Sequence, residues 1–156
     1  MISLIWAQTK NNVIGKNNSL PWNIKKEMQH FVDYTRGKDV LMGRNTFDSL
    51  KKKPLPNRKN IVITSRPLEL EYNEIVIYNN LNNVLNEYKK IDKELVVIGG
   101  AQIFNEAMKY ADKLVVSIIN NNYDGNVFFP DWNKEDFNLI KKNECEEFTI
   151  YVYERK

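Results

Sequence analysis

The sequence predicts an α/β fold: a central mixed, mostly parallel sheet of about eight strands, helices on both faces and an antiparallel C-terminal hairpin. Short apolar runs alternate with segments of helical periodicity, which favours a parallel sheet covered on both faces. Near the C-terminus two strand-like segments follow one another without a helix, which indicates the hairpin. No internal repeat and no linker divides the chain, so we expect a single domain over residues 1–156.

The first half of the chain alternates strands with two helices. One helix is expected to begin near residue 24 and to end near Gly37, a residue suited to a helix end. A shorter helix is expected over 44–50. The polar segments 8–23 and 51–59 are expected to be loops, and long loops in compact domains are often functional. The strands of this half are predicted at 2–7, 39–43, 61–64 and 75–78.

The second half repeats the alternation and then ends in the hairpin. Helical spacing predicts a helix over 81–88, and a second helix is expected to follow Gly100 and to end near Tyr110. Residues 120–132 are expected to form a loop. The strands are predicted at 95–98, 114–119, 137–141 and 148–153.

Composition excludes several classes of protein. The net charge of +3 is spread thinly, and the one cluster, Lys51-Lys52-Lys53, is too short for a nucleic-acid face. The mild positive balance of the chain could still help to steer an anionic small molecule. One cysteine, Cys145, and one histidine, His30, exclude an internal disulfide and a Cys/His metal site. We expect His30 to lie on the wet side of its helix. Without a leader or membrane span, a cytoplasmic protein is expected.

An acidic residue shares the apolar side of the first predicted helix. At about 100° per residue, Glu27 falls within roughly 100° of arc with three apolar residues. A carboxylate among apolar groups is unfavourable unless something pairs with it, and no basic residue lies on this stripe. The expected partner is a ligand; the alternative is that Glu27 is a solvated surface residue. The three apolar residues are Ile24, Met28 and Phe31.

Two predicted strand ends have the character of phosphate sites. Gly99-Gly100 would let the backbone approach a ligand, and the following helix would direct N–H groups at an anion. The alternative is an ordinary tight turn, because the third glycine of a dinucleotide fingerprint is absent. Arg44 begins a helix, where a cation opposes the macrodipole and a bound anion would offset it. Ser65 and Arg66 follow another strand, and paired arginines suit a phosphate monoester unless both are solvated.

Arg58 follows a loop made rigid by prolines and could hold a ligand carboxylate, or could be a surface residue.

Seven short stretches of the sequence carry a resemblance to a known family through their order and spacing. They are Met1-Ile-Ser-Leu-Ile5, Val13-Ile-Gly15, Leu20-Pro-Trp-Asn23, Val40-Leu-Met-Gly-Arg-Asn-Thr46, Pro54-Leu-Pro-Asn-Arg-Lys-Asn-Ile61, Val97-Ile-Gly-Gly100 and Phe128-Phe-Pro130. In this combination the chain resembles the dihydrofolate reductase family from end to end.

The resemblance implies an oxidoreductase that reduces 7,8-dihydrofolate to 5,6,7,8-tetrahydrofolate by hydride transfer from NADPH, in support of one-carbon and thymidylate metabolism. It implies NADPH as cofactor, no metal, small-molecule partners including antifolates, and a monomer. Two alternatives remain open: a related pterin or pyrimidine reductase, and a non-catalytic module that binds NADPH or sequesters folate.

The resemblance also implies roles for individual residues. The implied catalytic residues are Glu27, Trp22 and Leu20. Glu27 would hold the pterin through two hydrogen bonds and Trp22 would hold a water near it, while Leu20 belongs to the loop 9–23, which would act as a lid over the nicotinamide. Arg58 would pair with the α-carboxylate of the substrate's glutamate tail, and Gly99–Gly100 would be a cis peptide bond beside the pyrophosphate. The implied substrate-binding residues are Ile5, Ala7, Glu27, Met28, Phe31, Leu50, Leu55, Arg58, Ile98 and Ser117. The implied cofactor-binding residues are Ala7, Ile14, Gly15, Gly43, Arg44, Asn45, Thr46, Thr64, Ser65, Arg66, Ile98, Gly100, Ala101, Gln102, Ile103 and Phe104.

Four positions depart from common patterns of that family. Phe104 replaces a frequent tyrosine, Ser117 a threonine that braces the carboxylate, and Gln102 an arginine beside the cofactor phosphates. Asn126 stands where an aspartate often ties a second loop to the lid, which leaves the lid's attachment open. No departure removes a group that the reaction requires.

Overall fold

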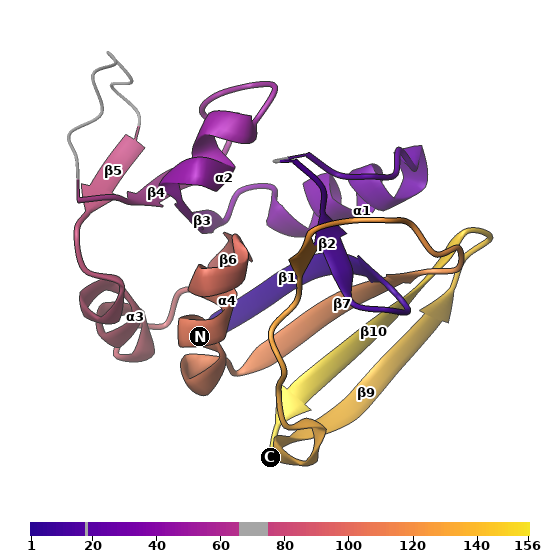
Figure 1. The fold of residues 1–156 in the computed structure, drawn as a ribbon. Helices are drawn as coiled ribbons and strands as arrows, with labels where there is room; N and C mark the ends of the chain where they lie inside the picture. The colour runs from indigo at the N-terminus through magenta and orange to yellow at the C-terminus, as the bar shows by residue number, and fades with distance from the viewer. Residues whose placement is uncertain (18, 66–74) are drawn as a thin grey trace.

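The computed structural model describes residues 1–17, 19–65 and 75–156. Its main feature is an eight-stranded sheet with the order β5-β4-β3-β6-β1-β7-β10-β9 (Figure 1). The pairs from β5 to β7 are parallel, whereas β7–β10 and β10–β9 are antiparallel, so the predicted fold class is confirmed. The strands are β1 Ile2–Thr9, β3 Asp39–Gly43, β4 Lys59–Ile63, β5 Ile75–Tyr78, β6 Leu95–Gly99, β7 Lys113–Ile119, β9 Phe137–Glu144 and β10 Phe148–Arg155.

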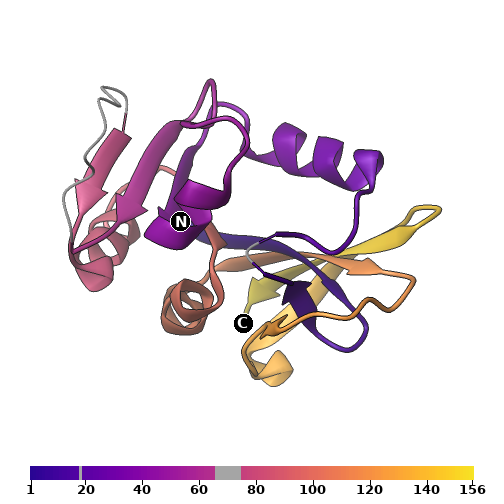
Figure 2. The ribbon, with the colours of Figure 1, turned by 45° about the horizontal axis from the view of Figure 1, so that its top comes forward.

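The helices cover both faces of the sheet, as the views in Figures 1 and 2 show. Alternation along β1 directs Leu4 and Trp6 into one core cluster, which contains residues of α3 and α4, and Ile5 into the other, which contains residues of α1 and α2. Among the described residues, no helix is long and apolar enough to cross a membrane. The helices are α1 Lys25–Thr35, α2 Arg44–Ser49, α3 Leu81–Lys89, α4 Ala101–Ala107 and the 3-10 turns Met108–Tyr110 and Lys134–Asp136.

Two very short strands lie in segments that we expected to be loops. β2 (Val13–Gly15) pairs antiparallel with β8 (Val127–Phe128), in a two-stranded sheet separate from the main one. Elements of two and three residues are too short to show a period, so the sequence pattern could not reveal them. The pairing brings the predicted lid segment 9–23 against the segment that follows β7.

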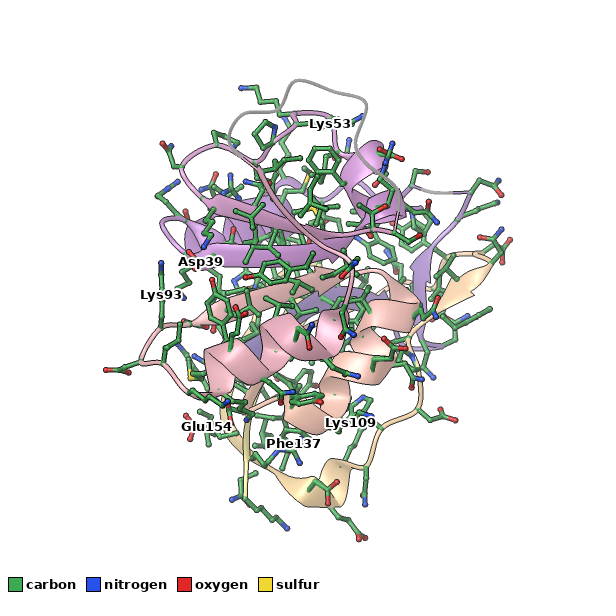
Figure 3. All side chains as sticks on the ribbon, turned by 90° about the vertical axis from the view of Figure 1, so that its left-hand side faces the viewer. Asp39, Lys53, Lys93, Lys109, Phe137 and Glu154 are labelled. Atoms are coloured by element: carbon green, nitrogen blue, oxygen red, sulfur yellow. The ribbon has the colours of Figure 1, made fainter. Side chains whose placement is uncertain are left out.

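The edge of the sheet where the parallel strands begin is closed by paired polar side chains. The buried carboxylate of Asp39 accepts a hydrogen bond from Tyr88 and lies 3.2 Å from Lys93 Nζ, and Figure 3 shows Asp39 and Lys93 on this side of the molecule. In a second cluster, Glu94 Oε2 accepts hydrogen bonds from Ser3 Oγ at 2.6 Å and Tyr34 Oη at 2.7 Å. The charged groups at this edge therefore have partners within the protein.

His30 does not lie on a fully wet face, contrary to our expectation. Its side chain is half-buried, and its Nε2 atom is buried without a hydrogen-bond partner among the described residues. Burial lowers the pKa of His30, Asp33 acts in the opposite direction, and Lys141 of β9 lowers it further. Helical spacing gives the angle at which a side chain leaves its helix, but it does not show that a distant hairpin approaches that side.

Candidate active site

The carboxyl group of Glu27 is buried, so the alternative that Glu27 is a solvated surface residue is wrong. Glu27 lies in the first turn of α1 and is 7% exposed. Burial raises its pKa from the ordinary value of 4.5 to about 7, while the hydroxyl of Ser117 acts in the opposite direction. A carboxyl group with a pKa near neutrality can hold or release a proton under physiological conditions.

Two further polar atoms near this part of the core have no partner. Ser117 lies on β7 and is 1% exposed. Its Oγ forms no hydrogen bond of full geometry with a described residue, but it lies close enough to Glu27 to lower the pKa of that residue. Trp22 Nε1 is also buried without a hydrogen-bond partner among the described residues. Buried polar atoms are normally satisfied, so orphaned ones beside a buried acid are what a site for a polar ligand or a water requires.

Apolar side chains from four different segments join the core cluster that α1, the helix of Glu27, packs against. The core cluster that includes Trp22 and Ile24 brings them together, and all but Ile5 are half-buried. Met28, by contrast, is 47% exposed, so the apolar stripe of α1 is narrower than we predicted. Leu20 is also exposed, at 51%. The predicted residues that the cluster gathers are Ile5, Ala7, Phe31, Leu50, Leu55 and Ile98.

Arg58 is held at the far end of α1. Its Nη1 donates to Thr35 Oγ1 at 2.9 Å and its Nε donates to Pro56 O at 2.8 Å. The buried side chain of Asn60 fixes the loop by bonding both the N–H and the C=O of Leu55 at 2.9 Å. Burial lowers the pKa of Arg58, and the neighbouring Arg36 lowers it further. A guanidinium fixed in this way, with N–H groups to spare, is suited to a carboxylate.

Glycines bring two neighbouring strand ends together at the carboxyl edge of the sheet. The Gly99–Gly100 peptide bond is cis, as the resemblance implied, and Gly99 has a φ of +131° that other residues rarely adopt. A Cβ on Gly100 would lie 3.4 Å from Thr46 Oγ1, and a Cβ on Gly43 would lie 3.2 Å from Ile103 Cγ1. Larger residues would narrow the space between the ends of β3 and β6.

Arg44 has a partner that the sequence argument did not foresee. Its Nε donates to both carboxylate oxygens of Asp48 at 3.1 Å, one turn later in α2. Asp48 thus offsets the charge of Arg44, and no bound anion is needed for that purpose. The terminal guanidinium nitrogens still make no hydrogen bond to another described residue, so they are available to a phosphate.

The other predicted cofactor residues are distributed along the same edge. Phe104 is 3% exposed and packs in the core cluster with Trp6, which places its ring beneath Gly99. Thr64 is buried at the end of β4 and Ser65 is exposed beside it. Arg66 lies outside the described residues. The remaining predicted residues, Asn45, Ala101 and Gln102, lie at the starts of α2 and α4, whereas Ile14 and Gly15 lie on β2.

The lid segment is tied to the loop after β7 by Asn126. Its Oδ1 accepts a hydrogen bond from Asn17 N at 3.1 Å, its Nδ2 donates to Asn17 Oδ1 at 3.2 Å, and its own N donates to Gly15 O at 3.1 Å. An asparagine therefore provides the attachment that the sequence left open. Neighbouring Gly125 was missed by the sequence argument, although a glycine opposite a functional loop is a signal of close approach.

Two cavities lie away from Glu27. One of about 410 Å³ is on the opposite face of the sheet, between β7, β10 and residues 129–134, and one of about 310 Å³ lies between residues 23–26 and 146–148. Neither is lined by Glu27. We place the site at Glu27 nevertheless, because the orphaned polar atoms and the raised pKa are there. No group of three or more potential metal ligands occurs within the described residues.

A buried acid among apolar side chains, next to a strand edge left open by glycines, defines a class of α/β protein that binds its ligands at the carboxyl ends of the strands. A sequence model of the family described as dihydrofolate reductase matches residues 1–155. A dihydrofolate reductase of Ureaplasma parvum is 41% identical over 157 aligned positions, covering 100% of this chain and 98% of that protein. One of Bacillus subtilis is 37% identical over 156 positions, covering 99% of this chain and 91% of that protein.

A solved structure is similar as well. A dihydrofolate reductase from Enterococcus faecalis, complexed with NADP(H) and RAB-propyl, matches with a TM-score of 0.90 and 27% identity, over 100% of this chain and 96% of that one. This chain belongs to the dihydrofolate reductase family.

The residues present fit a nicotinamide dinucleotide. The glycines at the ends of β3 and β6 leave the backbone accessible, and Arg44 keeps terminal guanidinium nitrogens for a phosphate. Gln102 is exposed and carries no charge, so the arginine that some members of the family have there is not available.

The burial of Glu27 predicts a pH-dependent stability. Its folded pKa of about 7 exceeds the unfolded value near 4.5, so its contribution to the free energy of unfolding is largest below pH 4.5 and is lost as the pH rises through about 7. The conversion is 1.36 kcal/mol per pKa unit. We therefore expect the free energy of unfolding of Glu27→Gln, taken relative to that of the unaltered protein at the same pH, to rise by about 2 to 3 kcal/mol from pH 5 to pH 8. Urea denaturation at the two pH values measures this. An equal stability difference at both would show that the carboxyl group is not desolvated.

Proposed function

We propose that this chain reduces 7,8-dihydrofolate to 5,6,7,8-tetrahydrofolate with NADPH as reductant. The observation that carries the proposal is the buried carboxyl group of Glu27, with its raised pKa, on a helix whose inner side packs against an apolar core cluster. Membership of the family and the neighbouring structure complexed with NADP(H) support the choice of substrate and cofactor.

The residues of the chain would bind the pterin, exclude bulk solvent and help to supply the proton. NADPH, when bound, supplies the hydride from its nicotinamide ring. Glu27 accepts hydrogen bonds from the pterin and sets the electrostatics of the site, and the proton reaches N5 of the pterin through water. Ile5, Phe31 and Leu50 exclude bulk solvent and hold the pterin flat, which brings the reacting rings together.

Arg58 favours a folate over another pterin or pyrimidine substrate. Its guanidinium is fixed by Thr35 and Pro56 with donors to spare, and a substrate without a carboxylate tail would leave them unused. A non-catalytic folate-binding or NADPH-binding module is disfavoured by the lid, because storage does not need control of water at the nicotinamide.

A single spectrophotometric experiment separates these three functions. Oxidation of NADPH is followed at its near-ultraviolet absorbance with dihydrofolate, with dihydropterin lacking the glutamate tail, or with no second substrate. The proposal expects oxidation with dihydrofolate, and much weaker oxidation with dihydropterin. Fluorescence quenching by NADPH without any oxidation would instead support the binding module.

Arg44 is proposed to select NADPH over NADH. We expect Arg44→Ala to raise the KM for NADPH by about tenfold or more, because a charge-assisted hydrogen bond contributes roughly 1.5–3 kcal/mol. The KM for NADH should rise by less than about threefold. Steady-state kinetics with both cofactors tests this, with Lys109→Ala as a control that removes a distant, exposed cation. Equal losses for the two cofactors would refute phosphate recognition by Arg44.

We further propose that the chain acts as one domain, as a monomer and in the cytoplasm, with small molecules rather than nucleic acid as partners. The support is the main eight-stranded sheet, to which both the first and the last strand of the chain belong, and the thin spread of charge. Sedimentation at several concentrations tests the oligomeric state.

A further inference from the structure

Two titratable side chains of α1 lie one helical turn apart on the part of the helix that meets the sheet. Glu27 and His30 are three residues apart, and at this spacing the Cβ atoms of a helix are about 5–6 Å from each other. Glu27 is buried and His30 is half-buried. The proposed reaction gives a role to Glu27 but none to His30. The two side chains are close enough for a proton to pass between them directly or through one water.

The imidazole ring of His30 has an unsatisfied nitrogen on its buried side. Its Nε2 atom is buried and has no hydrogen-bond partner among the described residues. Buried polar atoms are normally satisfied, and a neutral imidazole offers one nitrogen as donor and the other as acceptor. In the tautomer with the hydrogen on Nδ1, the buried Nε2 is a free acceptor. A proton received from Glu27 would satisfy it.

The hairpin formed by β9 and β10 approaches His30 from the sheet. Val115 of β7 lies opposite Val152 of β10, and Val152 lies opposite Lys141 of β9. Residues opposite one another share a face of the sheet, and both valines pack in the core cluster that α1 contacts. Lys141 therefore lies on the face under α1, where its charge lowers the pKa of His30. His30 thus leaves α1 on the side of the hairpin.

The charges around His30 act in opposite directions. Burial and Lys141 lower the pKa of His30, whereas Asp33, in the same helix, raises it. The net effect is a pKa below the ordinary value of 6.5, so the ring is neutral at pH 7 and can accept a proton. Further charged groups around this helix are Lys26 in α1 itself, Lys113 of β7 and Glu154 of β10, which lies opposite Lys113.

We infer that His30 is a positioning residue for the proposed reaction, and that its Nε2 atom takes up the proton that Glu27 gives up when a pterin binds. This inference rests on the proposed function. A pterin that donates two hydrogen bonds to Glu27 needs the carboxylate, because a protonated carboxyl group is itself a donor. The O–H bond of Glu27 breaks, an N–H bond forms at His30, and no proton has to leave the molecule. The resulting carboxylate and imidazolium attract one another across one helical turn.

The two groups hold a proton with similar strength, so a bound ligand can decide where it lies. The pKa of Glu27 is about 7, and burial places that of His30 somewhat lower. Just below pH 7 the empty pair therefore carries one proton, mainly on Glu27. Two hydrogen bonds from a ligand favour the carboxylate and move this proton to His30. Without His30 the proton would be displaced into solvent, and binding would weaken as the pH falls.

The titration of His30 can be followed directly. His30 is the only histidine of the chain, so its imidazole signals in proton–carbon NMR spectra need no assignment. Saturation with pteroyl monoglutamate should raise the midpoint of the His30 titration by about one pH unit or more, because a carboxylate is then held beside the ring. In Glu27→Gln, saturated with the same ligand, the midpoint should move by much less. A midpoint that the ligand leaves unchanged in the unaltered protein would overturn the inference.

The pH dependence of ligand binding is a readout that a purely structural role of His30 would not change. The Kd for pteroyl monoglutamate is measured by quenching of tryptophan fluorescence at pH 7 and pH 6. In His30→Gln and His30→Phe it should rise by about fivefold from pH 7 to pH 6, because binding then displaces a proton from Glu27 into solvent. In the unaltered protein the rise should be only about twofold. Equal rises in all three proteins would reject the transfer.

Two neighbouring lysines of β9 provide a matched pair of variants. Lys141→Gln removes the cation that opposes protonation of His30, so the His30 midpoint should move upward. Lys142→Gln removes the same charge from the next position, where Nζ lies 3.3 Å from Glu144 and 5.7 Å from the ring centre of Tyr151. This variant should leave the midpoint close to that of the unaltered protein. Equal shifts in the two variants would contradict the surroundings assigned to His30 and, with them, the inference.

The same measurements separate the proton transfer from the proposed function, because neither the NMR titration nor the quenching needs turnover. A ligand-induced shift at His30 in a protein that does not oxidise NADPH with dihydrofolate would keep the proton transfer and reject the reductase. Turnover of dihydrofolate with no change at His30 on ligand binding would reject the proton transfer and keep the reductase.

Discussion

Replacing Glu27 with Gln is expected to lower kcat/KM for dihydrofolate by about 10²- to 10³-fold at pH 7. The amide keeps the shape of the side chain but cannot carry the negative charge that orients the pterin and polarises the path of the proton. Because kcat/KM reports the ionisations of the free enzyme, its pH profile should show an inflection near the pKa of about 7, and the inflection should be absent in the variant. Activity in the variant should partly recover on acidification, as solvent supplies the proton more readily.

Substitutions of Ser117 test the pKa of the Glu27 carboxyl group in a second way. Its hydroxyl lowers the pKa of Glu27, so Ser117→Ala should move the inflection to a higher pH without abolishing activity. Thr in place of Ser117 keeps the hydroxyl and should keep the inflection near its original position. Unchanged turnover in Glu27→Gln, or an inflection that persists there, would contradict the role assigned to this carboxyl group.

Replacing Gly125 with Ala is expected to separate the lid from the loop that holds it. A Cβ at this position would lie 2.3 Å from Val13 Cγ1 and 2.5 Å from the backbone oxygen of Gly15, so β2 must move. The movement would break the bond from Asn126 N to Gly15 O and expose the nicotinamide side of the site to water. We expect the single-turnover rate of hydride transfer to fall by about tenfold to a hundredfold, and the free energy of unfolding by about 1–3 kcal/mol.

A second glycine supplies the control for this variant. Gly37 has a φ of +74°, and nothing lies within 4 Å of the position of an added Cβ. Gly37→Ala should therefore lower stability through backbone strain alone and leave the single-turnover rate close to that of the unaltered protein. If Gly125→Ala reduced stability to the same extent and left hydride transfer unchanged, the lid would not depend on this contact.

The sequence was sufficient wherever a pattern is local. Buried strands such as β3 and β6 are continuous apolar runs, and their ends at Gly43 and Gly99 could be read directly. Glu27 was recognisable because an acid on an apolar stripe conflicts with its surroundings, and conflicts of that kind are expected at functional sites. The resemblance then supplied roles that no pattern contained.

What escaped prediction depends on contacts between distant segments. The pairing of β2 with β8, the half-burial of His30 with Lys141 of β9 near enough to affect its pKa, and the bond between Arg44 and Asp48 arise from how elements meet, not from their composition. Gly125 belongs to the same category, since its significance comes from Gly15, more than a hundred residues earlier. The resemblance drew attention to Asn126, but its bond to Asn17 depends in the same way on how distant segments meet.

The two edges of the parallel strands differ in how their polar groups are satisfied, and amide hydrogen exchange should detect the difference. Asp39 and Glu94, at the edge where the strands begin, have tyrosine and lysine partners within the protein. Amides around them should exchange only when the whole molecule unfolds, whereas those near Gly15 and Asn126 should exchange through smaller local openings. Ligands bound at the open edge would slow exchange there selectively, so the protein would become uniformly protected only when it is occupied.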